Sequence, residues 1–197
     1  MNSNSTRAII LILLALLMAV TRSNLPFHFM PVPDASWAVF FIGGFYLRAW
    51  TKWAFPLLMG LAVAVDWWVI SNQGISFWQH YCVSAAYWFL VPAYFALWLG
   101  GSVVRRFYNQ RLGKFLGVLV ASVLVSVALC QLLAQGSFYW ISDSVHNPTL
   151  AGWWQNYTEW LLPYLRTTVI YTGVAVVLHV VALSAARVLA AQDKSAH

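Results

Sequence analysis

The chain has very few charged residues for its length. Of its 197 residues, only 8% are Asp, Glu, Lys or Arg, whereas a soluble domain carries about 25%. With so few charges, a soluble protein of this size has no means of covering its surface with groups that water solvates. A water-soluble enzyme is therefore excluded. Lipid must solvate most of the chain, and because lipid offers the backbone no hydrogen bonds, the spanning segments are expected to be helices.

The sequence also lacks the motifs of thiol, zinc and nucleotide chemistry. Its two cysteines, Cys82 and Cys130, form neither a CxxC pair nor a zinc pattern, and they do not indicate a disulfide framework. No Walker sequence is present, so the chain itself is not expected to hydrolyse ATP. The net charge of +6 comes from basic residues scattered between apolar runs. That scatter favours a role in membrane topology and not nucleic-acid binding.

Apolar residues dominate what is present. They make up 61% of the chain, and the 12 Trp residues fit the aromatic belts of membrane interfaces. The apolar runs predict an all-α integral membrane protein, a single domain of six transmembrane helices over residues 1–197. A kink is expected near Pro92, and a polar loop is expected over residues 136–157. The expected helices cover residues 7–22, 35–50, 53–70, 75–104, 112–135 and 158–189.

The basic residues predict the orientation of the helices. The first apolar run, Ala8–Val20, is short enough for a secretory signal, but no small-x-small cleavage site follows it, which favours a retained helix. With six spans, alternate connections share a side. Of the 11 Lys and Arg residues, only Arg22 and Arg166 fall on the side opposite the termini. A bias of nine against two predicts cytoplasmic termini.

The outer side collects the unusual polar residues. An ionised Asp66 in lipid would cost about 3 kcal/mol or more, so it either faces a cavity or a partner, or it snorkels to the interface. Arg166 either pairs with Asp66 or Glu159 or holds a polar ligand. Cys130 and His179 are interpreted as core or lipid-facing residues. The outer residues are His28, Asp66, His80, Cys82, Tyr87, Asp143, His146, Glu159 and Arg166.

Cys82 offers the most specific chemistry on this side. Soft thiolate binds transition metals, but one cysteine and one loop histidine, His28, cannot form a closed metal cage. They can supply axial ligands to a metal already held in a macrocycle, which means haem or a corrin. Haem in membrane helices usually needs paired histidines near mid-depth, and only His179 lies deep. A corrin is therefore the better fit.

The chain resembles the BtuM family, solitary S components related to the energy-coupling-factor (ECF) vitamin transporters and specific for cobalamin. The cysteine in HYCVSAAYW, His28 in LPFHFMP, Asp66 in AVDWW and the six-span layout carry the resemblance, which covers essentially the whole chain. It implies an S-component-like bundle in the bacterial inner membrane. That bundle would bind cobalamin (vitamin B12) in a pocket open to the outer face and take it up.

The resemblance also implies roles for particular residues. Cys82 would ligate the cobalt of a base-off corrin, and thiolate donation would weaken the opposite axial bond and promote removal of an upper cyano ligand. His28 would lie near the opposite face of the cobalt. The polar residues that would line the corrin pocket are Asp66, Tyr87 and Arg166.

Partners follow from the same resemblance. It implies an ECF-type transmembrane coupling subunit with its ATPases, or else transport by the chain alone. Ala15 and Ala19 have the small-xxx-small spacing of close helix contacts, but an ordinary alanine-rich helix explains them equally well. The rim of a bound corrin is expected to stack on Trp153 or Trp154.

Two other function classes remain open. Cys82 and Cys130 are both expected about two helical turns below the outer surface, so a membrane thiol redox protein is an alternative, although CxxC is absent. A structural assembly subunit without a ligand is the second alternative. In that case the outer polar residues would only snorkel.

Overall fold

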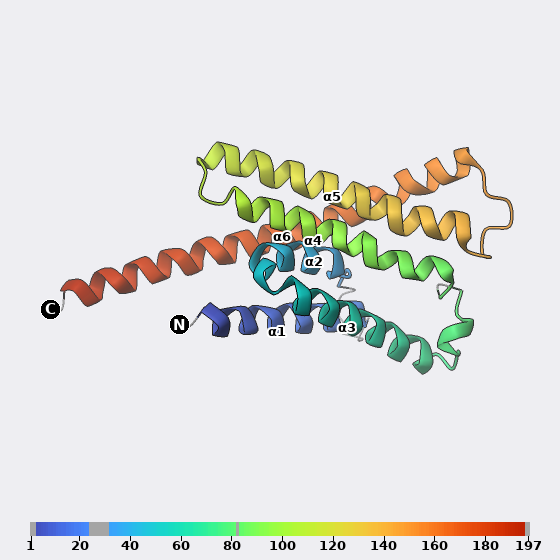
Figure 1. Ribbon diagram of the computed structural model, residues 1–197, viewed down its shortest axis with the longest axis horizontal. Coiled ribbons are helices and arrows are strands. Elements are labelled where there is room, and N and C mark those ends of the chain that lie inside the picture. Colours follow the sequence, from blue (N-terminus) through green and yellow to red (C-terminus); the bar gives the residue numbers. More distant parts are fainter. Residues whose placement is uncertain (1–2, 24–31, 82, 196–197) are drawn as a thin grey trace.

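The structure is a computed structural model that describes residues 3–23, 32–81 and 83–195 of the chain. Helices are the only regular secondary structure of these described residues, as the sequence predicts. Helices α1 and α6 have their chain-terminal ends at the same end of the bundle, where α4 also passes into α5 (Figure 1, left). The elements are α1 (Ser3–Arg22), α2 (Ser36–Tyr46), η1 (Arg48–Trp50), α3 (Thr51–Asn72), η2 (Phe77–Gln79), η3 (Ala85–Phe89), α4 (Leu90–Arg106), α5 (Leu112–Ile141) and α6 (Leu150–Ser195), where η denotes a 3-10 helix.

The described residues contain five segments long and apolar enough to cross a membrane, and α2 is a shorter apolar helix. Large apolar side chains on their outer faces are exposed, for example Leu162 at 69% and Leu178 at 63%. An apolar surface of this extent is stable in lipid and not in water. The chain is therefore a multi-pass membrane protein. The five segments are Asn4–Arg22, Arg48–Asn72, Ala85–Arg106, Leu112–Ile141 and Leu150–Leu189.

Helix α2 lies at the centre of the bundle. It has 11 residues, nine of them buried, and its length of about 16 Å falls short of the roughly 30 Å hydrocarbon layer. Its most extensive contacts are with α4. A Cβ on Gly44 of α2 or on Gly101 of α4 would overlap the backbone of the opposite helix. Ser102 also donates a hydrogen bond of 3.1 Å to the carbonyl of Gly44. These small residues let the two backbones approach closely.

The segment before α4 differs from the predicted helix over residues 75–104. Two short 3-10 helices, η2 and η3, stand there, and α4 begins only at Leu90. The hydroxyl of Ser84 accepts a hydrogen bond from the N–H of Ala86, which begins η3. Pro92 lies in the first turn of α4, where its missing N–H has no helical partner to lose. Pro92 therefore marks the beginning of a helix and not a kink.

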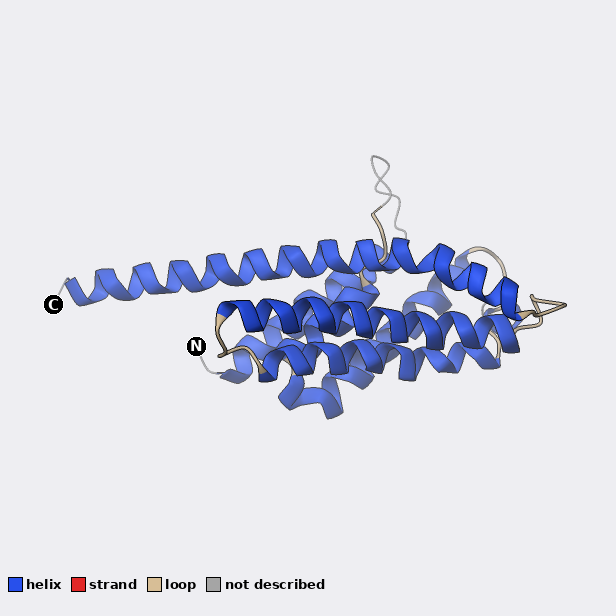
Figure 2. Ribbon diagram, turned by 90° about the horizontal axis from the view of Figure 1, so that it is seen from above, coloured by secondary structure: helices blue, strands red, loops and turns tan. Residues whose placement is uncertain are grey.

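Other helix bounds also differ from the predictions. The expected loop over residues 136–157 is wrong, because α5 continues to Ile141 and α6 begins at Leu150. Polar residues there are paired between the two helices: Gln135 of α5 donates to Asn156 of α6. The expected helix over 35–50 ends at Tyr46 and is followed by η1. Figure 2 shows α6 bending in its N-terminal part, as proline-containing helices do, and extending past the other helices at its C-terminal end.

Candidate ligand-binding site

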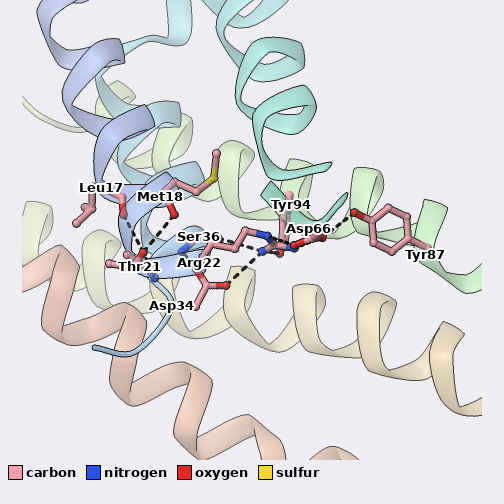
Figure 3. A network of polar contacts seen from close by, with 10 residues as sticks. Leu17, Met18, Thr21, Arg22, Asp34, Ser36, Asp66, Tyr87 and Tyr94 are labelled. Carbon is pink, nitrogen blue, oxygen red and sulfur yellow. Dashed lines mark hydrogen bonds and ion pairs between the residues drawn. The ribbon is translucent and has the colours of Figure 1, made fainter. Parts of the chain in front are cut away.

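Arg22, the last residue of α1, is the centre of a polar network (Figure 3). Its Nε and Nη2 donate to the two carboxylate oxygens of Asp66 on α3, at 2.6 and 2.7 Å. Its Nη1 lies 3.2 Å from Asp34 Oδ2 and donates to the hydroxyls of Ser36 and Tyr94 at 3.1 and 3.0 Å. Only 12% of the Arg22 side chain and 19% of the Asp66 side chain are exposed. The ion pair is therefore largely shielded from bulk water.

The end of α1 is fixed to the beginning of α2 by hydrogen bonds. The Thr21 hydroxyl accepts from the backbone N–H of Ala35 at 3.1 Å. Asp34 accepts from the N–H and the hydroxyl of Ser36 at 2.9 and 2.6 Å, which satisfies a free donor in the first turn of α2. These contacts hold Arg22 between α2 and α3.

Tyr87 extends the network to η3. Its hydroxyl donates to Asp66 Oδ2 at 2.7 Å, so one carboxylate joins α1, α3 and η3. Charge-assisted bonds of this kind are stronger than neutral ones, and a paired carboxylate is tolerated within a membrane span. Asp66 thus has protein partners, as one of the two sequence interpretations expected. Its basic partner is Arg22, and not the Arg166 that the sequence suggested.

A cavity of about 600 Å³ lies beside this network, near the ends of α1 and α3. Ligand sites in proteins typically have about 300–1,000 Å³ and combine apolar walls with a few convergent polar groups. Charged and amide side chains in its wall are Arg22, Asp34, Asp66, Gln73, Gln131 and Gln135. Aromatic side chains in its wall are Trp37, Tyr81, Tyr87, Tyr94, Phe138 and Tyr164.

Gln131 of α5 supplies a free hydrogen-bond donor to this wall. The residue is 1% exposed, and within the described part of the chain its Nε2 has no hydrogen-bond partner. A buried donor left unsatisfied costs about 1–3 kcal/mol. Such a group is a place where a ligand carbonyl or a water molecule can bind. Trp37 and Tyr164 also line this cavity, where they stack with their ring centroids 4.4 Å apart and offer an aromatic face.

The structure brings Asp66 and Tyr87 together, as described above, but the two predicted cobalt ligands, His28 and Cys82, lie outside the described residues. The chain before Cys82 can be followed, and His80 and Tyr81 line the cavity. Within the described ranges, no group of three His, Cys, Asp or Glu side chains is placed to hold a metal ion.

Arg166 does not line the cavity, and neither do Trp153 and Trp154, the two tryptophans near the beginning of α6. The Arg166 side chain is exposed, whereas Tyr164, two residues earlier, lines the cavity. Two residues correspond to about 200° around a helix, so these side chains point to different sides. Trp153 and Trp154 do not line the cavity either. The aromatic face expected from them is provided instead by Tyr164 and its stacking partner Trp37.

Cys130 and His179 each lie in an environment that explains them by packing or hydrogen bonding. Cys130 is fully buried in the apolar core, as one interpretation of the sequence expected. The His179 ring lies between two hydroxyls, with Nδ1 2.8 Å from Tyr46 and Nε2 2.7 Å from Tyr108. Thiol exchange requires an accessible sulfur, so the burial of Cys130 weighs against the redox alternative.

Sequence reasoning missed three residues of the site: Arg22, Tyr94 and Gln131. Arg22 was noted only as an outer basic charge, although Asp34 and Asp66 on the same side were a signal for pairing. Gln131 interrupts the apolar run of α5, and a polar residue inside a span usually faces the protein interior or a cavity. Tyr94 gave no comparable signal, because tyrosines are common throughout the chain.

The fold is that of a multi-pass α-helical membrane protein, and it contains a polar, aromatic-lined cavity. No family model matches the chain, and no curated protein is significantly similar to it in sequence.

Proposed function

We propose that this chain binds cobalamin from outside the cell and takes it up across the bacterial inner membrane. The cavity beside the Arg22–Asp66 pair is the observation that carries the proposal. Its charges are already paired with one another, so what the wall offers a ligand is amide groups and aromatic faces. Cobalamin is a corrin bordered by carboxamides, which can exchange hydrogen bonds with glutamine and tyrosine side chains while the macrocycle packs on aromatic rings. The molecule is larger than the cavity, so part of it would project from the opening.

The proposed cobalt ligand is Cys82. His80 and Tyr81 directly precede it in the chain and line the cavity, which supports this assignment. The thiolate sulfur would form a bond to Co(III) in a base-off corrin. The weakened Co–CN bond would then break, cyanide leaving with its electron pair and taking a proton from water, and cobalt would remain Co(III). His28 is proposed to lie near the opposite face of the metal.

The orientation proposed for the six spans follows from charge. Basic residues are concentrated at the end where α1 begins and α4 passes into α5, which the positive-inside rule assigns to the cytoplasm. Both termini are then cytoplasmic, and the cavity faces outward. The basic residues at that end are Arg7, Arg48, Lys52, Arg105, Arg106, Arg111, Lys114, Arg187 and Lys194.

A transmembrane coupling subunit with its ATPases is the partner that we propose, docked on α1. Ala15 and Ala19 are half-buried, and they lie beside an exposed apolar face that includes Ile12, Leu13 and Leu16. Small residues next to such a face permit close approach of another helix in lipid. Uptake by the chain alone remains the alternative to this assembly.

The experiment that tests the proposal is a visible absorption spectrum of detergent-purified protein after incubation with cyanocobalamin and removal of free ligand. The wild-type protein is expected to retain a red chromophore with a base-off, thiolate-ligated spectrum. Cys82→Ala should lose that spectral signature, whereas the buried Cys130→Ala serves as the control and should keep it. A wild-type protein that stays colourless would contradict the cobalamin proposal, and an unchanged spectrum in Cys82→Ala would contradict the assignment of the ligand.

A further inference from the structure

Two cavities at the opposite end of the bundle share a wall. The first, which we call the basic cavity, has about 530 Å³ and lies between the beginning of α1, η1 and the end of α4. The second, which we call the apolar groove, has about 290 Å³ and runs between α2, α4, α5 and α6. Phe45 and Tyr46 of α2 line both of them. The two cavities are therefore neighbours, although their linings differ in chemistry.

The basic cavity collects three arginines from three elements. Arg7 of α1, Arg48 of η1 and Arg105 of α4 line it, and both ion pairs found among the described residues belong to Arg22 at the other site. Three like charges around one space repel one another, and an anion between them removes that repulsion. Guanidinium groups present paired N–H donors that match the oxygens of a phosphate. The chemistry of this cavity thus fits a phosphate group.

Arg105 also contacts the wall that the two cavities share. Its guanidinium carbon lies 5.3 Å from the centre of the Phe45 ring and 5.0 Å from that of Tyr108. Phe45 lines both cavities, and Tyr108 lines the groove. These cation–π contacts hold the charge of Arg105 against aromatic rings that line the groove.

The apolar groove is built for hydrocarbon. Three of its polar wall residues satisfy one another, because the His179 ring is bonded through both nitrogens to the hydroxyls of Tyr46 and Tyr108. The other two are Gln110 and Thr172, and the buried Thr172 hydroxyl has no partner within the described part of the chain. The groove lies along α5 and α6, whose outer faces are apolar over their spanning segments. A fatty acyl chain entering from the bilayer would find apolar contacts there. The wall residues that would contact it are Ile42, Phe115, Leu119, Val176 and Val180.

We propose that an anionic phospholipid binds at this end of the bundle, with its phosphate among Arg7, Arg48 and Arg105 and one acyl chain in the apolar groove. A soluble anion has no chain for the groove, and a zwitterionic lipid brings a cation beside the arginines. The lipid would join α1, η1 and α4, whose basic ends otherwise repel one another. This site is separate from the cavity at the other end, and it does not depend on cobalamin binding.

The test compares lipid binding by the full chain in detergent. Phosphatidylglycerol, phosphatidylcholine and inorganic phosphate are added separately, and bound lipid is counted by native mass spectrometry while thermal unfolding is followed. Wild-type protein is expected to retain phosphatidylglycerol and to gain several degrees in Tm from it alone. In Arg48→Gln/Arg105→Gln, the affinity for phosphatidylglycerol should fall about thirtyfold, since each interfacial arginine contributes roughly a fivefold preference for anionic lipid.

The matched control is Arg106→Gln/Arg111→Gln. These arginines lie at the same end and are exposed, but they line neither cavity, so the control removes equal charge and should retain the lipid. A second variant, Val176→Trp, fills the groove without changing charge and should weaken lipid binding as well. Equal stabilisation by both lipids, an equal loss in the charge control, or full replacement of the lipid effect by inorganic phosphate would each overturn the proposal.

Discussion

The guanidinium of Arg22 holds the carboxylate of Asp66 by two parallel hydrogen bonds of 2.6 and 2.7 Å, although the residues are 44 positions apart in the sequence. This geometry fixes the end of α1 against α3 and places the charge of each residue where the other neutralises it. The wall of the cavity is therefore polar without a net local charge from this pair. That property suits a ligand that offers amides and hydroxyls more than one that carries an ion.

Breaking this pair should destabilise the protein strongly. In Asp66→Asn the carboxylate charge is lost and Arg22 keeps only Asp34 as an acidic partner. Removing one member of a buried pair costs about 3 kcal/mol, because the other charge is left without compensation. Thermal unfolding in detergent measures the loss. The double variant Asp66→Asn/Arg22→Gln should recover part of it, and strictly additive losses would contradict the coupling.

Removing the Tyr87 hydroxyl should have a smaller effect of the same kind. Tyr87→Phe deletes one bond to a carboxylate, and a bond to a charged group contributes about 1.5–3 kcal/mol. Tyr171→Phe is the control, because the exposed hydroxyl of Tyr171 donates a hydrogen bond of 2.8 Å to an uncharged acceptor, the carbonyl of Pro33. The unfolding temperature of the Tyr87 variant should fall clearly further. Equal decreases in unfolding temperature would show that the hydrogen bond to Asp66 stabilises the protein no more than the bond to the Pro33 carbonyl.

The helical architecture could be predicted because it depends on local composition. A run of about 20 apolar residues is long enough to span lipid wherever it occurs, and α1, α3 and α5 follow that rule. The segment over residues 75–89 misled the prediction because it is rich in aromatic residues, which are apolar enough to resemble a span. The Ser84 bond to Ala86 that begins η3 depends on a single side chain. Composition averaged over a window does not detect it.

The polar partners could not be predicted in the same way. Which face of α1 carries Arg22 towards α3 depends on how the helices rotate about their axes, and packing at positions such as Gly44 and Gly101 decides that rotation. Asp66 could be singled out from the sequence because a carboxylate in a span needs a partner. The choice between Arg22 and Arg166 required the fold, since the sequence predicts the same side for both arginines and only Arg22 lines the cavity.

The close contact of α2 with α4 predicts that alanine is destabilising at Gly101 but not at Gly117. In Gly101→Ala the new Cβ would overlap the carbonyl of Phe41 on α2, and overpacking of this kind typically costs about 1–3 kcal/mol. Gly117 of α5 is the control, because a Cβ there meets nothing within 4 Å. Gly117→Ala should be neutral or slightly stabilising, since alanine favours helix by about 1 kcal/mol. Thermal unfolding of both variants tests the contact, and similar unfolding temperatures would contradict it.

Replacing Gln131 by leucine should raise the stability of the ligand-free protein and weaken its binding of cobalamin. Gln131→Leu replaces a buried amide, whose Nε2 has no partner among the described residues, by a branched apolar group. Removing an unsatisfied donor should raise the free energy of unfolding of the ligand-free protein by about 1 kcal/mol. If the cavity binds cobalamin through this amide, the same variant should weaken retention of the red chromophore by roughly tenfold.

Gln135 provides the matched comparison, because it lines the same cavity but its side chain is already bonded to Asn156. Gln135→Leu leaves the side-chain carbonyl oxygen of Asn156 without its hydrogen-bond donor. This variant should therefore lower the stability of the ligand-free protein instead of raising it. Thermal unfolding without ligand and cobalamin retention measured by absorbance separate the two variants. A Gln131→Leu protein that is less stable than wild type would mean that the amide has a partner in the membrane. A more stable variant with unchanged retention would mean that the ligand does not reach α5.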